Sequence, residues 1–205
     1  MDRKYLSQVT LFIVASEAVL FCLFSQDASF VEENGLIENL QVLVLFLGGL
    51  ASLSAAFLLK RDAKEGNFSR KVIGYGFAIL ALSFIVRELD FRGVEGFDLI
   101  VPWTSSPGSR WLTLFFWMPF FIYIGFNRSS FKRVVLQYWR SEHFWRMSIV
   151  VCVLIFSDLV ENGVVPLMPT QFFEESLELV AYLLFSWNLL KIKGIKLNNH
   201  GGVNE

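Results

Sequence analysis

The sequence has few of the residues from which disulfide frameworks and soft-metal sites are built. Its 205 residues include two cysteines and two histidines. Cys22 and Cys152 are too few for a disulfide framework, and we interpret both as small core residues, not as a disulfide or metal pair. His143 and His200 both fall on the predicted cytoplasmic side, which argues against haem or histidine-bound zinc on the opposite side.

Sequence motifs for nucleotide binding and covalent catalysis are absent as well. The chain has no glycine-rich phosphate loop, no dinucleotide fingerprint and no Ser-His-Asp set. Its 18 basic residues are balanced by 19 acidic ones, and no segment matches a nucleic-acid-binding motif. The sequence therefore predicts no nucleic-acid partner.

Apolar residues, in contrast, are abundant and fall in long blocks. They make up 54% of the chain, 22 residues are Phe, and the mean hydropathy is +0.50. A helix of about 20 apolar residues is long enough to cross the hydrocarbon core of a bilayer. We predict an all-α polytopic membrane protein, a single integral-membrane domain over 1–205, with six transmembrane helices at 6–24, 36–59, 72–91, 111–126, 147–165 and 172–190.

Lys and Arg are distributed unevenly between the two predicted sides of this membrane domain. Fifteen of the 18 lie before the first span, after the last span, or in the connections after the second and fourth spans. Because positively charged loops stay in the cytoplasm, both termini are predicted to be cytoplasmic, with 191–205 as a cytoplasmic tail. The expected location is a membrane crossed several times, the inner membrane of a bacterium.

The segment 127–146 alternates basic with aromatic residues. Arg128, Lys132 and Arg140 are separated by residues such as Phe131 and Trp139. This composition is typical of a helix that lies in the plane of the lipid headgroups. We therefore predict a cytoplasmic interfacial helix between the fourth and fifth spans.

Acidic residues gather on the opposite side. Thirteen of the 19 lie at or beyond the predicted outer ends of the spans, and no Lys or Arg occurs between Ser157 and Tyr182. The helix dipole stabilises acids only at helix N-termini, so it does not explain those at the C-terminal ends. We predict one outward-facing cation-binding cluster, with Arg87 as its charge partner, formed by Glu38, Glu88, Asp158, Glu161, Glu174 and Glu178. The competing interpretation is a set of separate, solvated helix ends.

Glu17 lies inside the first predicted span. A rise of 1.5 Å per residue from Leu6 puts it roughly 16 Å deep. An ionisable group near the midplane of a bilayer is a functional candidate by default. We interpret Glu17 as a candidate midplane relay, and a protonated, hydrogen-bonded structural residue is the alternative.

A carboxylate cluster of this kind is compatible with three functions. Oxygen ligands favour Mg²⁺, Ca²⁺ or Mn²⁺ as the bound cation, which indicates a cation-binding membrane protein, as a transporter or channel. A second hypothesis is a non-catalytic membrane subunit that docks a partner, or a second copy of itself, through its acidic outer face. The third is a metal-dependent membrane-embedded enzyme that activates water. The sequence identifies no catalytic residue.

Overall fold

The described part of the chain is entirely helical, as predicted. The computed structural model describes residues 3–25, 36–58, 64–89 and 108–191. These residues form seven helices: α1 (Arg3–Phe24), α2 (Leu36–Leu58), α3 (Lys64–Glu88), α5 (Gly108–Phe126), α6 (Arg128–Trp139), α7 (Glu142–Glu161) and α8 (Thr170–Lys191). The predicted tail, most of the two outer connections after the first and third spans, and the last residues of the second and third spans lie outside the described ranges.

The start of α7 differs from the prediction for a local reason. The apolar run predicted a helix from residue 147, whereas α7 begins at Glu142. Ser141 is its N-cap, and the Ser141 hydroxyl accepts a hydrogen bond of 3.4 Å from the Phe144 backbone N–H. Such a cap satisfies a backbone donor that the first helical turn leaves without a partner. The helix therefore extends back into the polar sequence.

The end of α7 is also earlier than predicted, at Glu161 instead of residue 165. Gly163 has a φ of +69°, which a residue without a Cβ adopts at little cost. The Gly163 N–H donates to the Val160 carbonyl at 3.0 Å and the Val164 N–H to the Leu159 carbonyl at 2.9 Å. This pair of bonds is a Schellman motif, which terminates the helix.

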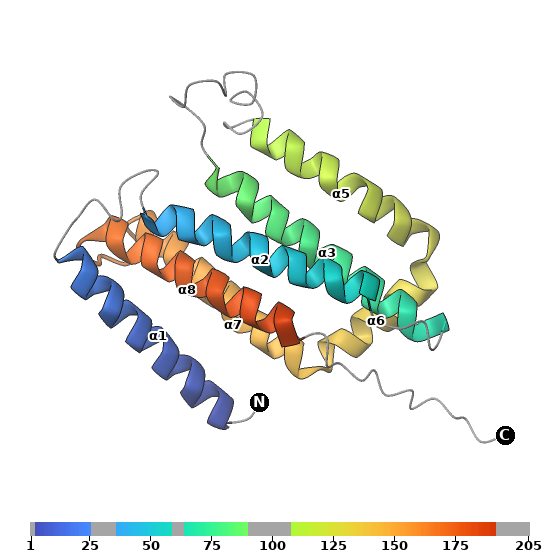
Figure 1. Cartoon of the computed structure of the whole chain (residues 1–205), viewed down its shortest axis with the longest axis horizontal. Coiled ribbons are helices and arrows are strands. Elements are labelled where there is room, and N and C mark those ends of the chain that lie inside the picture. Colours follow the sequence, from blue (N-terminus) through green and yellow to red (C-terminus); the bar gives the residue numbers. More distant parts are fainter. Residues whose placement is uncertain (1–2, 26–35, 59–63, 90–107, 192–205) are drawn as a thin grey trace.

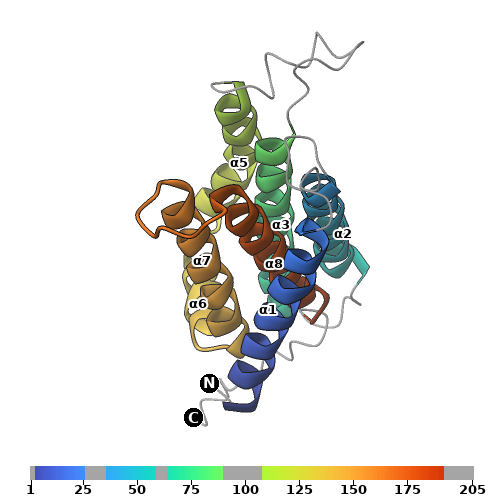
Figure 2. The ribbon, with the colours of Figure 1, turned by 90° about the vertical axis from the view of Figure 1, so that its left-hand side faces the viewer.

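The long helices lie side by side, and successive ones run in opposite directions (Figure 1). As a result, α1 begins and α8 ends at the same end of the bundle (Figures 1 and 2). We call this the basic end, because α6 with Arg128, Lys132 and Arg140 lies there. The opposite end, where α2 and α8 begin and α3 and α7 end, is called the acidic end.

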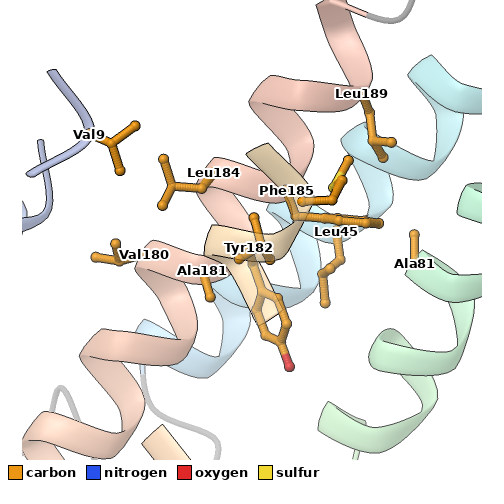
Figure 3. Packing of buried hydrophobic residues seen from close by; sticks show 11 residues of the cluster. Val9, Leu45, Ala81, Val180, Ala181, Tyr182, Leu184, Phe185 and Leu189 are labelled. Carbon is orange, nitrogen blue, oxygen red and sulfur yellow. The ribbon is translucent and has the colours of Figure 1, made fainter. Parts of the chain in front are cut away.

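The helix α8 forms the centre of the bundle. It packs against α1, α2 and α7, and its Tyr182 ring lies 5.3 Å from that of Phe84 on α3. Val180, Tyr182 and Phe185 are at most 1% exposed. Figure 3 shows side chains of α1, α2 and α3 gathered around this helix, with the Tyr182 hydroxyl pointing away from the apolar cluster. The side chains of α8 therefore set the contacts of four neighbouring helices.

Small residues allow α2 to approach its neighbours closely. The Ser186 hydroxyl on α8 donates to the Val44 carbonyl at 2.8 Å, and a Cβ placed on Gly48 would lie 3.2 Å from the Ser186 Cα. On the other side of α2, the Ser52 hydroxyl donates to the Gly74 carbonyl of α3 at 2.9 Å. Each hydroxyl bonds to backbone on the facing helix, so these contacts need a short distance between the helix axes.

Two helices in the described ranges are long and apolar enough to cross a membrane. They are α2 over Leu36–Phe57 and α7 over Glu142–Glu161, whereas the apolar stretch Ser7–Leu23 of α1 is shorter. Core helices of soluble proteins can meet the same criterion of length and composition. The helical class is thus established for the described residues, whereas length and composition alone identify two candidate spans among them.

Candidate functional site: the acidic end of the bundle

Arg87, in the last turn of α3, joins this helix to α8. Its Nη2 donates a hydrogen bond to Oε1 of Glu178, and its Nε lies 3.3 Å from Oε1 of Glu88. The Tyr182 hydroxyl donates to the same Glu88 oxygen at 2.7 Å. Glu178 and Tyr182 are four residues apart and therefore share one face of α8. One guanidinium thus bridges two carboxylates from two helices.

The two carboxylates bridged by Arg87 are buried, but the arginine is not. The side chains of Glu88 and Glu178 are 9% and 7% exposed, whereas that of Arg87 is 52% exposed. Charged groups this deeply buried are stabilised only when they are paired and hydrogen-bonded. Arg87 therefore covers the buried carboxylates from the solvent-facing side.

Glu175 is held by α2. The fully buried Gln41 donates from Nε2 both to the Glu175 backbone carbonyl and to its Oε2, each at 3.0 Å. The Gln41 Oε1 atom is buried and has no donor in the described residues. The amide of Gln41 therefore fixes the first turn and a half of α8 against α2.

Glu17 on α1 meets the same segment of α8. The Ser176 hydroxyl donates to Oε2 of Glu17 at 2.7 Å, and Oε1 of Glu17 is buried without a donor in the described residues. Seven residues separate Glu17 from Phe24, so it lies roughly 10 Å from the acidic end of α1. The sequence analysis predicted that Glu17 is separate from the outer acids. The structure instead places Glu17 against Ser176, which follows Glu175 and precedes Glu178 on α8.

The remaining predicted acids lie around this centre. Glu174 is half-buried and interacts electrostatically with Glu161 and Glu178. Asp158 and Glu161, both exposed, act on Glu178, and Glu38 acts on Glu88. Electrostatic interactions therefore connect all of the predicted carboxylates and add Glu175. We call this set the acidic cluster: Glu38, Glu88, Asp158, Glu161, Glu174, Glu175 and Glu178.

Among the described residues, the acidic cluster contains more carboxylates than cationic partners. Arg87 is the cation among the main electrostatic partners of Glu88, Glu174 and Glu178. Two carboxylates about 5 Å apart repel by roughly 3 kcal/mol at an effective dielectric constant near 20. Within the described ranges, however, no group of three or more His, Cys, Asp or Glu side chains is arranged to hold a metal ion. Arg87 contacts two of the carboxylates, Glu88 and Glu178, and the described acids form no metal-holding group.

Several residues of this site were not part of the sequence prediction. Glu175, Gln41 and Tyr182 hold their positions through contacts between helices, although Tyr182 continues the stripe of Glu174 and Glu178 at helical spacing. Nothing in the sequence indicates that Ser176 belongs to the site, because a serine within an apolar helix commonly bonds to the backbone of its own helix.

Comparison of the chain with protein-family models, with curated proteins and with solved structures found no match.

Proposed function

We propose that the protein is a multi-pass membrane protein, spanning the bilayer with α1, α2, α3, α5, α7 and α8, and that the acidic cluster binds a cation. The outward faces of the helices support the membrane location. On α5, Trp111, Phe115 and Phe121 are 66%, 67% and 58% exposed. Soluble proteins rarely expose contiguous apolar surface of this kind.

The two helices that satisfy the spanning criterion support the same location. Only 33% of the apolar window in α2 and 22% of that in α7 is buried inside the bundle. A core helix of a soluble protein would be buried over most of its surface. On α2, the exposed residues Leu40, Leu43, Leu47 and Leu50 follow one stripe at helical spacing. Lipid is the environment that suits such a stripe.

The excess of carboxylates over cations among the described residues is the observation that supports cation binding. Arg87 is already engaged by Glu88 and Glu178. The charge of Arg87 also acts on Glu174, but the hydrogen bond and the close contact of Arg87 go to Glu178 and Glu88. Glu174 interacts with Glu161 across the turn between α7 and α8. A cation between them would offset their mutual repulsion and the repulsion between Glu174 and Glu178.

The form of the cluster favours a hydrated cation as the ligand. Mg²⁺ keeps several of its water ligands and is commonly bound by one or two carboxylates, so it does not need a set of three protein ligands. We assign Glu161 and Glu174 as its ligands. Binding is better supported than conduction, because Leu45, Phe185 and Leu189 fill the bundle interior between the site and the basic end.

The experiment is a thermal unfolding series on the detergent-solubilised protein, with MgCl₂, CaCl₂ or MnCl₂ and with NaCl at matched ionic strength. We expect MgCl₂ to raise the wild-type midpoint, because a ligand that binds only the folded state stabilises it by about 2.7 kcal/mol at 100 times its Kd. Glu161→Gln and Glu174→Gln should lose this rise.

Glu142→Gln is the matched control, because it removes the same charge from an exposed acid at the basic end, where Glu142 pairs with Arg146. It should keep the full response to MgCl₂. If none of the three divalent ions shifts the wild-type midpoint, cation binding is wrong and the hypothesis of a partner-docking subunit takes its place. An unchanged response in Glu174→Gln would show that the ion binds elsewhere.

A further inference from the structure

A cavity of about 280 Å³ lies at the basic end, between α3, α5 and α6. Its walls include Gly76 and Leu80 of α3, Phe120 of α5, and Phe131 and Val135 of α6. An apolar cavity of about 150 Å³ is large enough to bind benzene, and ligand pockets begin at about 300 Å³. The space is therefore large enough for part of an alkyl chain.

The walls of this cavity offer too few polar groups to hold water. Three lining residues have polar side-chain atoms, Trp117, Tyr138 and Trp139. Two of them use these atoms elsewhere, since Trp117 Nε1 donates to the Ser83 hydroxyl at 3.0 Å and the Tyr138 hydroxyl donates to the His143 carbonyl at 3.4 Å. Burial also raises the pKa of the Tyr138 hydroxyl, which keeps it neutral. A buried water needs two to four polar partners, so the suitable occupant is apolar.

The face of α6 that lines the cavity is bordered by positive charge. Phe131, Val134, Val135 and Tyr138 line the cavity at the spacing of one helix face. At about 100° per residue, Arg128 and Lys132 lie within roughly 60° of Val135, on the side on which Val135 and Trp139 are exposed. An alkyl chain that entered past these two residues would carry its headgroup beside them.

The first turn of α6 gives a second reason to expect an anion at this place. Its N-cap, Asn127, makes no side-chain hydrogen bond to the first turn, and α6 is 12 residues long. The backbone N–H groups of a first turn and the positive end of the helix dipole together favour phosphate. Arg128 is the first residue of this turn, so the guanidinium and the backbone donors lie at the same place.

We infer that the cavity between α3, α5 and α6 holds an acyl chain of one anionic phospholipid, whose phosphate lies against Arg128, Lys132 and the first turn of α6. Charge complementarity selects an anionic lipid over a neutral one, since each basic residue near a membrane surface attracts anionic lipid. The inference depends on the membrane location proposed above, but not on the binding of a cation at the acidic end.

The headgroup contact is tested by native mass spectrometry of the full-length protein in detergent, titrated with phosphatidylglycerol or phosphatidylcholine. We expect one phosphatidylglycerol to bind in preference to phosphatidylcholine. Arg128→Gln and Lys132→Gln should each weaken phosphatidylglycerol binding about fivefold. Arg140→Gln removes the same charge beyond the C-terminal end of α6 and should leave binding unchanged. Equal binding of the two lipids, or equal effects of the three variants, would overturn the headgroup assignment.

The acyl-chain contact needs a separate pair of variants. Val135→Trp fills the cavity from its exposed edge and should abolish the one-to-one complex. Leu136→Trp adds the same bulk at the neighbouring exposed residue, which does not line the cavity, and should retain the complex. If Val135→Trp, folded as judged by its unfolding midpoint, still binds the lipid, the chain is not in this cavity.

A different experiment tests the membrane location itself. If the protein does not span the membrane, alkaline carbonate extraction of cell membranes will release the wild-type protein. A protein that stays in the membrane pellet but binds both lipids equally would contradict only the lipid site.

Discussion

The Tyr182 hydroxyl donates a hydrogen bond of 2.7 Å to Oε1 of Glu88, the same oxygen that Arg87 Nε approaches at 3.3 Å. Tyr182 is fully buried in the centre of α8, whereas Glu88 is the last residue of α3. This bond ties the central helix to the acidic end of its neighbour. It also connects the apolar core to the acidic cluster, since the Tyr182 ring packs against Phe84.

We predict that Tyr182→Phe lowers the stability of the protein by about 1.5–3 kcal/mol, because a hydrogen bond to a charged group contributes that much and its loss leaves a buried carboxylate with one donor fewer. The measurement is the unfolding midpoint in detergent at neutral pH. Tyr75→Phe is the matched control, since Tyr75 packs edge-on against Phe57 and this ring contact survives the change. Equal midpoints for the two variants would contradict the role of the Tyr182 hydroxyl.

Replacing Arg87 should lower the stability of the protein more than removing the Tyr182 hydroxyl does. Breaking a buried ion pair from one side costs about 3–5 kcal/mol, and the half-exposed position of Arg87 puts the expected loss for Arg87→Gln near the lower value. Adding Glu178→Gln to this variant should recover part of the lost unfolding midpoint, because the unpaired buried charge of Glu178 is then removed.

Acidification gives an independent test of the same bridge. Protonation neutralises carboxylates that Arg87 no longer pairs, so the midpoint of Arg87→Gln should approach that of the wild type as the pH is lowered. Arg140→Gln, at the basic end, should differ little from the wild type at any pH. A difference between Arg87→Gln and the wild type that is constant over pH would mean that the loss is one of packing alone.

Two neighbouring glycines of α2 should respond in opposite ways to alanine. A Cβ on Gly48 would lie 3.0 Å from the Ser186 Cβ and 3.2 Å from its backbone Cα, whereas a Cβ on Gly49 would meet only the Ala81 Cβ at 3.4 Å. Gly48→Ala should therefore destabilise by about 1–3 kcal/mol through overpacking against α8. Gly49→Ala should be neutral or stabilising by up to about 1 kcal/mol, because alanine favours the helix.

The same thermal unfolding series measures both glycine variants. Their difference is the informative quantity, because both replace a glycine in one helix. If Gly48→Ala is as stable as Gly49→Ala, α2 and α8 do not approach each other this closely.

The proposed orientation predicts which ends of the bundle are accessible from outside the cell. Cys22 and Cys152 are both exposed, so their interpretation as core residues is wrong, and both are first replaced by alanine. In this variant an impermeant thiol reagent should label Val164→Cys, in the turn between α7 and α8, in intact cells. Ser129→Cys, at the opposite end, should be labelled only after lysis. Both native residues are exposed, so access is not limited by burial. The reverse pattern would place the acidic cluster in the cytoplasm.

The sequence by itself determined where the helices lie. Each described long helix covers most of one apolar run, because a run of that length satisfies its backbone hydrogen bonds internally as a helix. Local chemistry also determined the ends of α7, through Ser141 as N-cap and Gly163 at the C-terminal turn. These signals were present in the sequence, but the apolar run alone predicted a helix displaced by about a turn.

The charge pattern along the chain also determined that most acids and most basic residues fall at opposite ends. Alternating helix directions carry every second connection to the same end, so the depth of Glu38, Glu88, Glu161 and Glu174 follows from their places in the sequence. The places of these residues in the sequence do not determine which of their side chains contact one another.

Only the tertiary structure decided the partners and the central helix. Arg87 and Glu178 are 91 residues apart and Ser176 and Glu17 are 159 apart, and no local pattern relates such positions. Nor could apolarity identify α8 as the buried helix, since α2 and α5 are apolar as well and yet expose long faces. The rotation and the neighbours of each helix depend on packing against others, through Gly48 against Ser186 and Gln41 against Glu175, and these contacts exist only once the bundle has formed.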